Sequence, residues 1–469
     1  MRTLRPLFVL LGLFTAPVLP AQAPSASPDS LARDILRELI GINTAPSGGA
    51  MGDATRAMAA RLRAAGYDGD DVRLAGPDAA HANLVATLRG RDRAAPPILL
   101  MAHVDVVEAR REDWSLDPYA LHERDGYYYG RGTTDNKGGA AVLVANMIRW
   151  RQEGFVPARD VVTILTTDEE TTAEGGIQWL LAHEPRLATA EYALNTDAGG
   201  LLVPPAGPPR FFVQSSEKMY QTFRLTVTNR GGHSSLPRPD NAIYALARAL
   251  ARLEAHRFPV MYNAVTTESF ARSARLERGA RAADLRALAR GDTAGAAVAR
   301  LSRDPVVNGN LRTTCVATML AGGHAENALP QQAQATVNCR VFPGVTAAEV
   351  QRTLARVVRD PGVHVEQVGP TTPSPASPLR PDVMAAVEAG AAATWPGAVA
   401  IPVMENGATD GLFLRNRGVP VYGVSGPLYD VGDDRAHGRD ERVAVRHFHA
   451  VLAFWDRLVR TVAASPSSL

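Results

Sequence analysis

Three consecutive acids, Asp168, Glu169 and Glu170, follow a β-branched, apolar run at residues 161–167. Such a run is typical of a buried strand, so these carboxylates gather where a strand meets its loop. Adjacent carboxylates repel one another and are costly to bury unless a cation or a shared proton compensates. In an extended backbone Glu169 and Glu170 point in different directions, so one can bind a metal ion while its neighbour handles a proton. The three acids therefore predict a cation site.

His103 and Asp105 end another apolar run, which begins at Ile98. Positions i and i+2 of a strand face the same way, so His103 can bind a metal through one ring nitrogen while Asp105 fixes the ring. Taken alone, a histidine and an aspartate at this spacing more often mark a core histidine with satisfied hydrogen bonds.

Asp135 and Asp197 complete the candidate ligands. Asp135 lies in a glycine-rich turn at 130–139, which lacks the spacing of a phosphate loop and suits a cation better because of its acid. Asp197 ends an apolar run at 192–196. A single aspartate at a strand end is usually a helix cap or a loop charge, so the inference depends on the whole set.

The elements that must position these residues alternate between strands and helices. Strands are expected at 83–88, 98–107, 161–167 and 192–196, and helices from Asp29 (as N-cap), from about 55 to Gly66, at 138–151 and at 175–182. This alternation predicts an α/β fold with a mixed, mostly parallel sheet flanked by helices. The candidate ligands would then lie at the carboxyl ends of successive strands, where such sheets place their sites.

The mixture of histidine and carboxylate ligands suits Zn²⁺, with Co²⁺ or Mn²⁺ as alternatives. Four or five ligands with several carboxylates exceed what one catalytic zinc needs. A pair of cations about 3.5–4 Å apart and bridged by one carboxylate accounts for the surplus.

The pattern changes after a proline cluster at 204–209. A separate α+β unit is predicted there, with strands at 218–228, 313–320 and 334–342 and with helices capped by Asp240 and at 347–358. After residues 370–381 the chain is expected to continue with a strand at 419–424 and a helix at 443–462. We expect a catalytic domain in two parts, 29–213 and 373–469, and an inserted lid or dimerisation domain at 214–372. The alanine- and arginine-rich segment 269–301 is expected to be a solvated helical hairpin, since acids interrupt its positive charge.

In these motifs the chain resembles the dinuclear-zinc exopeptidases and amidohydrolases that include aminoacylase, glutamate carboxypeptidase and carboxypeptidase S, and it is most similar to the carboxypeptidase S branch. The matching motifs are M-A-H-V-D-V-V from Met101, G-R-G-T-T-D-N-K-G-G from Gly130, T-T-D-E-E from Thr166, T-D-A-G-G from Thr196, G-G-H-S-S from Gly231, E-N-A-L-P from Glu326, V-N-C-R from Val337, G-A-T-D from Gly407 and A-H-G from Ala436.

The resemblance implies a role for each matching residue. One metal would be held by His103, Asp135 and Asp197, and the other by Asp135, Glu170 and His437. Asp105 would support the site and Glu169 would be the general base. His233 would reach the active site of a partner subunit, Arg340 would clamp the substrate carboxylate, and Asn327 and Thr409 would contact substrate. Without the resemblance, His437 and Arg340 would pass for surface residues and His233 for a turn residue.

The expected function is hydrolysis of amide bonds in dipeptides or short peptides by a zinc-dependent enzyme, working as a homodimer. Alternatives are an N-acyl amino acid amidohydrolase, a non-catalytic binding protein on the same fold, and a dinuclear phosphoesterase. Asp197 leaves open which end of the substrate is recognised, because several carboxypeptidase and aminoacylase relatives have Glu there, whereas peptidases that cut at a free amino terminus more often have Asp.

The N-terminus predicts export. Arg2 and Arg5 precede an apolar run at 7–19 and an A-x-A site at 21–23, so residues 1–23 read as a signal peptide and the mature protein as periplasmic or secreted. Its removal lowers the formal charge from +2 to about zero, which gives no electrostatic case for nucleic acid. No membrane span is expected in the mature chain.

Two residue types are scarce. Lysine occurs only as Lys137 and Lys218, which we interpret as compositional bias because arginine is abundant. The two cysteines, Cys315 and Cys339, fit either a disulfide of an exported protein or two buried thiols.

Overall fold

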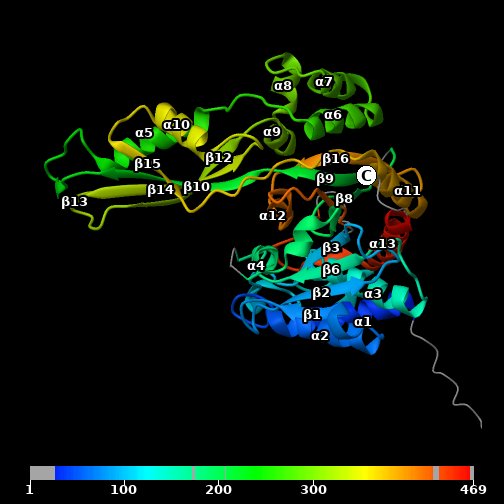
Figure 1. Ribbon diagram of the computed structural model, residues 1–469. Coiled ribbons are helices and arrows are strands. Elements are labelled where there is room, and N and C mark those ends of the chain that lie inside the picture. The colour runs from blue at the N-terminus through cyan, green and yellow to red at the C-terminus, as the bar shows by residue number, and fades with distance from the viewer. Residues whose placement is uncertain (1–26, 172–174, 206, 426–432, 465–469) are drawn as a thin grey trace, which may run out of the picture.

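The computed structural model describes residues 27–171, 175–205, 207–425 and 433–464 (Figure 1). The signal peptide expected at 1–23 lies outside the described residues. The helices are α1 (Pro28–Gly41), α2 (Met51–Ala64), α3 (Lys137–Gln152), α4 (Ile177–His183), α5 (Ala242–Ala255), α6 (Ala264–Leu276), α7 (Gly279–Ala289), α8 (Ala296–Leu301), α9 (Pro305–Leu311), α10 (Ala347–Val358), α11 (Pro381–Thr394), α12 (Gly411–Arg415) and α13 (Val445–Ala464).

The strands of the described ranges belong to four sheets. They are β1 (Val72–Ala75), β2 (Asn83–Leu88), β3 (Ile98–His103), β4 (His122–Arg124), β5 (Tyr127–Tyr129), β6 (Val161–Thr166), β7 (Tyr192–Asn195), β8 (Gly200–Leu202), β9 (Arg210–Glu217), β10 (Met219–Thr228), β11 (Gly232–His233), β12 (Thr314–Gly322), β13 (Ala328–Leu329), β14 (Gln332–Val341), β15 (Val363–Val368), β16 (Val399–Glu405), β17 (Val421–Gly423) and β18 (Arg442–Ala444).

The central sheet has the order β1-β2-β6-β3-β7-β17-β9-β16, with β8 paired to β9. Its middle strands, β6, β3, β7 and β17, run parallel, while β1 and β2 are antiparallel to their neighbours. Parallel strands buried on both faces need helices on both sides, and the helices provide that cover. The predicted α/β fold class is confirmed.

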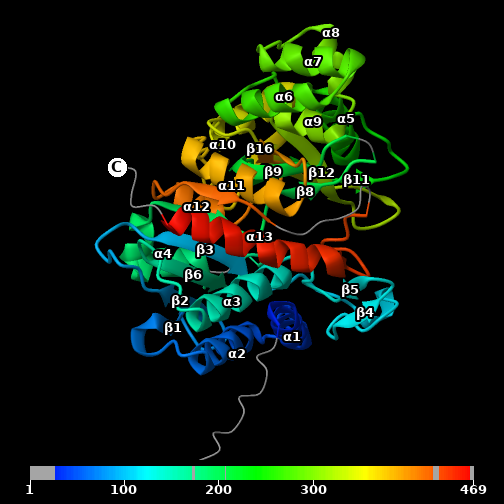
Figure 2. The ribbon, with the colours of Figure 1, turned by 90° about the vertical axis from the view of Figure 1, so that its right-hand side faces the viewer.

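Alternate residues of the strands pack into two separate cores. Leu100 and Ala102 of β3 join α1, α2, α3, α11 and α13 on one face, whereas Leu99 and Met101 join α4 and α12 on the other. Figure 2 shows α3 and α13 running along the first face. Strand β3 is therefore held from both sides, which fixes the place of His103 at its end.

The second large sheet is antiparallel, with the order β12-β14-β10-β15, and we call it the lid sheet. Residues of β10 alternate strictly between buried and more exposed, and the buried ones pack with α5 and α10. The other face carries no helix of its own among the described residues. Figure 1 shows the lid sheet projecting sideways from the central sheet, so that its far end lies well away from it.

The segment 269–301, which was expected to be a solvated helical hairpin, belongs to a small helical unit in the structure. Residues 264–311 form four helices, α6 to α9, with a small core of their own around Phe270, Leu288 and Leu311. Arg272 of α6 also donates to the backbone oxygen of Ala400 in β16, 2.9 Å away. The charge pattern correctly indicated helices but concealed this packing, because alanine contributes to a core as readily as to a surface.

Two predicted helix caps are wrong by one or two residues. The hydroxyl of Ser27, not Asp29, accepts from the first turn of α1, and Asn241, not Asp240, caps α5 by accepting from Ile243 and Tyr244. The true cap of α1 comes two residues before the expected one, since a proline at the first helical position allows the earlier start, and the true cap of α5 comes one residue after the expected one.

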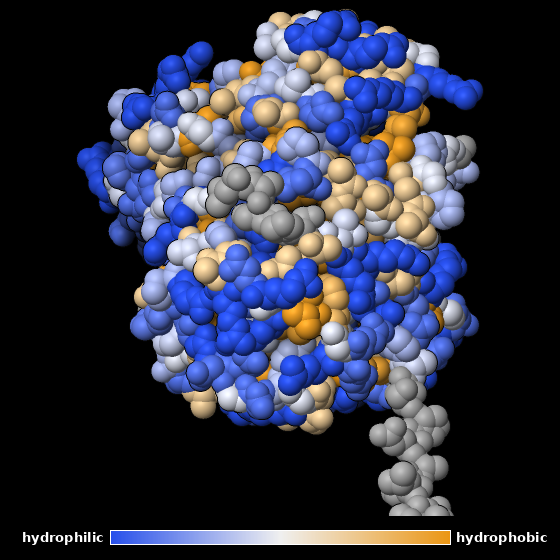
Figure 3. Space-filling view, turned by 45° about the vertical axis from the view of Figure 1, so that its right-hand side comes forward, coloured by the Kyte–Doolittle hydropathy of each residue, from blue (hydrophilic) through white to orange (hydrophobic). Residues whose placement is uncertain are grey.

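The two cysteines form a disulfide between directly paired residues of β12 and β14. Within the described residues, no helix is both long and apolar enough to cross a bilayer. The face drawn in Figure 3 is largely hydrophilic with scattered apolar patches.

Candidate metal centre

His103 ends β3 with a side chain that is 2% exposed. Its Nδ1 lies 3.0 Å from the backbone oxygen and 3.5 Å from Oδ1 of Asp105, which is fully buried. Its Nε2 faces the other way, 3.0 Å from Asp135 Oδ1 and 3.4 Å from Asp197 Oδ1. This is the arrangement of a metal-ligating histidine oriented through its second nitrogen.

The acidic triplet follows β6, and Asp168 takes a left-handed conformation with φ of 69°. Its carboxylate turns toward Thr171 and His81 and away from the cluster. The backbone N–H of Glu170 donates to Asp105 Oδ2 at 2.8 Å. Asp105 therefore positions both His103 and the loop that carries Glu169 and Glu170.

Asp197 lies in the loop after β7, beside the turn that carries Asp135. The side-chain amide of Asn136 donates to the backbone oxygen of Thr196 at 3.1 Å. Because each aspartate is next to one of these two residues, this hydrogen bond sets their separation.

The turn at 130–135 is held by Glu441, which is fully buried. Its carboxylate accepts from Arg131 at 2.7 Å, from the Gly132 N–H at 3.0 Å and from both N–H and hydroxyl of Thr134 at 2.7 Å. The Asp135 N–H donates to it as well, at 3.1 Å. Pairing of β18 with β5 brings Glu441 to this turn.

We expect Glu441→Gln to weaken metal binding by about 10–100-fold, the usual cost of disturbing a group that orients metal ligands. An amide cannot accept from Arg131 and from this many donors at once. Titration of the metal-free protein with Zn²⁺ measures the change, and Glu123→Gln on exposed β4 is the matched control. Equal affinities of the two variants would show that Glu441 has no such role.

Asp135 lies between the two histidines. Its Oδ1 is 3.0 Å from His103 Nε2, and its Oδ2 is 3.1 Å from His437 Nε2. The same nitrogen of His437 is 2.9 Å from Glu170 Oε1. Asp135 thus presents one oxygen to each of two groups of donors, His103 with Asp197 and His437 with Glu170, and this donor set fits a pair of cations bridged by one carboxylate.

Two further triads show how close the donors are. His103, Glu169 and Asp197 offer ligand atoms within 4.8 Å of one another, and so do His103, Asp135 and Glu170. Glu169 therefore lies at the centre together with the five expected ligands.

The charges of the cluster perturb one another. Burial alone would lower the pKa of His103, but Asp197, Asp105 and Asp135 raise it well above its usual range. Burial raises the pKa of Asp197 to about 7, against the opposing charge of His103. Hydrogen bonds to Asp135 and Glu170 raise the pKa of His437 to about 10. Protons on these histidines and carboxyl groups compensate for the excess negative charge of the cluster. Bound cations would compensate for the same charge.

Glu169 and Asp410 are two further acids near the centre whose pKa is raised. Burial and then Asp197 raise the pKa of Glu169 well above its usual value. Burial likewise raises the pKa of Asp410 to about 7, although the Thr166 hydroxyl donates to it at 2.7 Å. The motif G-A-T-D already contained Asp410, but no spacing along the chain could place this residue beside β6.

Thr409 has its hydroxyl and N–H directed to Glu217 Oε2, at 3.0 and 3.1 Å. Glu217 ends β9 and is fully buried, with Ser374 donating at 3.0 Å and Arg415 paired to it. In the described structure Thr409 thus fixes the loop before Asp410, and its hydroxyl is already engaged.

Arg340 lies near the end of β14, directly opposite Tyr220 of β10. Its guanidinium is 4.9 Å from the centre of the Tyr220 ring. Its neighbour Lys218 is fully buried and donates to the Thr314 hydroxyl at 3.1 Å. Burial and then the charge of Arg340 lower the pKa of Lys218 to about 7. Two cations that destabilise each other suit an anionic ligand. The other lysine, Lys137, is also buried. Both lysines of the chain therefore lie inside the protein, which the interpretation as compositional bias did not anticipate.

His233 and Asn327 lie far from this centre. His233 is exposed on β11, which pairs with β13, and the backbone oxygen of Asn327 accepts from Ser234. Figure 1 shows β13 at the tip of the lid, at the opposite end from the central sheet. The five expected metal ligands and Glu169 are thus brought together, whereas His233 and Asn327 are not.

The site and fold match a known family. A family model described as Peptidase family M20/M25/M40 matches residues 99–461. The chain is 29% identical over 384 residues to the human N-fatty-acyl-amino acid synthase/hydrolase PM20D1, covering 80% of this chain and 76% of that protein. It is 27% identical over 392 residues to the probable carboxypeptidase S-like 2 of Dictyostelium discoideum, covering 81% and 74%.

Solved structures of low identity share the fold. The M20 family metallo-carboxypeptidase Sso-CP2 of Sulfolobus solfataricus has a TM-score of 0.69 at 15% identity, covering 92% of this chain and 98% of that one. The di-peptidase Dug1p of Saccharomyces cerevisiae has a TM-score of 0.67 at 15% identity, covering 94% and 98%. The expected resemblance, including its carboxypeptidase S branch, is confirmed, and the protein is a metal-dependent hydrolase. The chain belongs to peptidase family M20/M25/M40.

Proposed function

We propose that this protein hydrolyses the amide bond next to a carboxylate-bearing residue in dipeptides or short peptides, with two Zn²⁺ ions at the described centre. The observation that carries the proposal is Asp135, whose two oxygens face His103 and His437. A centre for one zinc would need no shared carboxylate. His103, Asp135 and Asp197 would hold one ion, and Asp135, Glu170 and His437 the other.

When bound, the cations would polarise the scissile carbonyl and lower the pKa of water. Glu169 takes the proton from the attacking water and passes it to the leaving amine. The raised pKa of Glu169 supports this role, because a carboxylate of raised pKa is a stronger base for the proton of the attacking water. Asp105 keeps His103 in the orientation that directs Nε2 to the centre.

Arg340 would bind the substrate carboxylate, with Lys218 as a second cation beside it. We expect kcat/KM for a free dipeptide to be about 10–100-fold higher than for its C-terminal amide, because only the free carboxylate can make charge-assisted hydrogen bonds to Arg340. Arg340→Met should remove most of that difference by slowing only the free acid. Arg224→Met, on the same face but paired with Glu366, is the control. A wild-type enzyme that does not distinguish acid from amide would refute the carboxylate clamp.

A second candidate is hydrolysis of N-acyl amino acids, which carry the same carboxylate. It is favoured by relatives named N-fatty-acyl-amino acid synthase/hydrolase. A dipeptide and a long-chain N-acyl amino acid with the same C-terminal residue separate the two candidates. The peptidase proposal predicts the higher kcat/KM on the dipeptide, and the reverse order would replace it.

We further propose a homodimer in which His233 of one subunit completes the active site of the other. The position of His233 at the lid tip supports this, since it lies far from the metal centre of its own chain. Strand β12 is an edge of the lid sheet and exposes Val316 (61%), Met319 (68%) and Leu320 (71%). An exposed apolar edge strand is a surface that a second copy can cover.

Mixing two inactive variants tests the exchange. His233→Ala and Glu169→Gln should each be nearly inactive alone. After unfolding and refolding together, mixed dimers contain one site with both native residues, and about a quarter of the wild-type activity should return. If His233 serves its own subunit, mixing restores nothing. Sedimentation measured alongside shows whether the dimers have formed.

We propose that the protein is exported to the periplasm or secreted. The sequence features at 1–23 support this. The disulfide between Cys315 and Cys339 is also in keeping with an oxidising compartment.

A further inference from the structure

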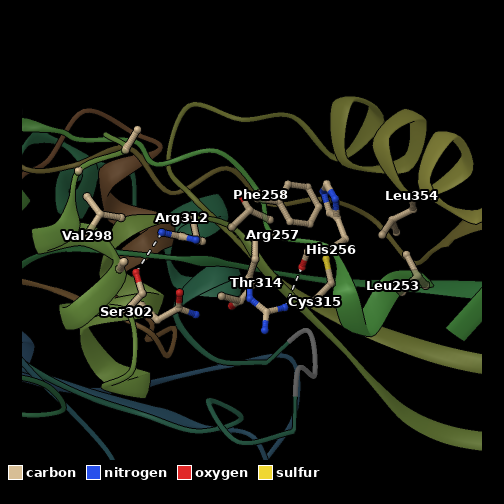
Figure 4. A pocket seen from close by; sticks show the side chains of 15 residues that line it. Leu253, His256, Arg257, Phe258, Val298, Ser302, Arg312, Thr314, Cys315 and Leu354 are labelled. Carbon is tan, nitrogen blue, oxygen red and sulfur yellow. Dashed lines mark hydrogen bonds between the residues drawn. The ribbon is translucent and has the colours of Figure 1, made fainter. Parts of the chain in front are cut away.

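A second concave site shares no residue with the metal centre. It is a cavity of about 420 Å³ between the helix-bearing side of the lid sheet and the helices α8 and α9 (Figure 4). The end of α5, the segment after it, Leu354 of α10, α8 and the beginning of β12 contribute to its wall. Three parts of the chain that are distant in sequence therefore meet around it.

One side of the cavity is basic. Arg312 is only 7% exposed, and it donates from Nη2 to the Ser302 hydroxyl at 3.1 Å. Its Nε is buried and has no hydrogen-bond partner within the described residues, and the same is true of His256 Nε2. Among the residues that the structure describes, Arg257 donates only to the backbone oxygens of Glu254 and His256, at 2.8 and 3.1 Å.

No carboxylate of the described residues pairs with these three side chains. Asp292, which precedes the lining residues Ala294 and Gly295, uses its carboxylate to accept from their N–H groups at 3.2 and 2.8 Å. Burial and then Arg257 lower the pKa of Arg312, and burial, Arg356 and Arg257 lower the pKa of His256. A buried positive charge without a counterion is costly, and an anionic ligand would remove that cost.

The rest of the lining is largely apolar. Leu253, Phe258 and Leu354 lie away from Arg312, together with Cys315 of the disulfide, and Val298 lies at the same end as Arg312. In Figure 4, Arg312 and Ser302 lie at one end and Leu253 and Leu354 at the other. A pocket with a few convergent polar groups and an apolar remainder is the usual form of a site for a small organic ligand.

We propose that this cavity binds an organic carboxylate with an apolar chain, whose carboxylate lies against Arg312 and Arg257 and whose chain lies against Leu253, Phe258 and Leu354. The planar guanidinium groups suit a carboxylate, and the apolar wall excludes a fully hydrated inorganic ion as the best occupant. Such a ligand would connect the lid to the α8–α9 segment. The site stands apart from the proposed catalytic function.

Calorimetric titration of the intact, metal-loaded protein with decanoate tests the proposal, with decan-1-ol as the uncharged probe. Two pairs of variants locate the binding. Ala299→Trp fills the cavity from α8, and Ala296→Trp places the same side chain on α8 outside the cavity. Arg312→Met removes the buried charge, and Arg303→Met removes an exposed one nearby.

We expect Ala299→Trp and Arg312→Met to weaken decanoate binding by at least about tenfold, as for the loss of a charge-assisted contact, and both control variants to bind like the wild type. Decan-1-ol should bind at least about tenfold more weakly than decanoate. Binding that persists unchanged in Ala299→Trp places decanoate elsewhere, including at the metal centre, and overturns the proposal. Equal affinity for the alcohol, or no binding to the wild type, does so as well. Unchanged dipeptide hydrolysis by Ala299→Trp confirms that the variant is folded.

Discussion

Glu169→Gln should lower kcat by about 10²–10⁴-fold, the usual contribution of a general base, while both metal ions remain bound. Glutamine has nearly the same shape as glutamate but cannot accept the proton of the attacking water. Steady-state hydrolysis of a dipeptide, with metal content measured on the same sample, gives both quantities. Loss of activity without loss of metal is the distinguishing result.

The adjacent residue is the matched control. Glu170 lies 2.9 Å from His437 Nε2 and should act as a ligand, so Glu170→Gln is expected to lose metal as well as activity. Glu169 also lies within ligand distance of His103 and Asp197. If Glu169→Gln loses metal and Glu170→Gln keeps it, the two roles are reversed. Normal turnover by Glu169→Gln would eliminate it as the base.

Asp135→Ala should abolish binding of the ion pair and reduce hydrolysis to the background rate. The variant removes one oxygen from each group of donors, and it leaves His103 and His437 near acids that repel one another. Metal content after dialysis against a known concentration of free Zn²⁺ measures the loss directly. Removal of metal from the wild type with a chelator should give the same inactive state, reversed by Zn²⁺.

Asp168→Ala provides the comparison for this second result. Asp168 is a buried aspartate next to the centre, but its carboxylate turns toward Thr171 and His81. We expect it to keep its full metal content. If Asp135→Ala retains two ions per chain, the bridging carboxylate has been misidentified, and a single-metal centre based on His103 becomes the better description.

The local features of this site could be predicted from the sequence because they depend on short-range geometry. Apolar runs that end in acids give strands with carboxylates at their carboxyl ends, and the structure places β3, β6 and β7 accordingly. The strand expected at 218–228 is present as β10, and its burial alternates as in a sheet with one covered face. Helix boundaries were less accurate, because adjacent polar residues such as Asp240 and Asn241 compete for the same cap.

The sequence by itself therefore determined the fold class, the candidate ligands and the family to which their motifs belong. Only the tertiary structure decided which of them meet. Pairing of β18 with β5 brings Glu441, and with it the His437 loop, to the turn of Asp135 across some three hundred positions of chain. The lid sheet carries His233 away from its own centre, and pairing of β12 with β14 joins the cysteines. No periodicity along the chain records such contacts, because they depend on which strands lie side by side, and that is settled by the packing of the whole domain.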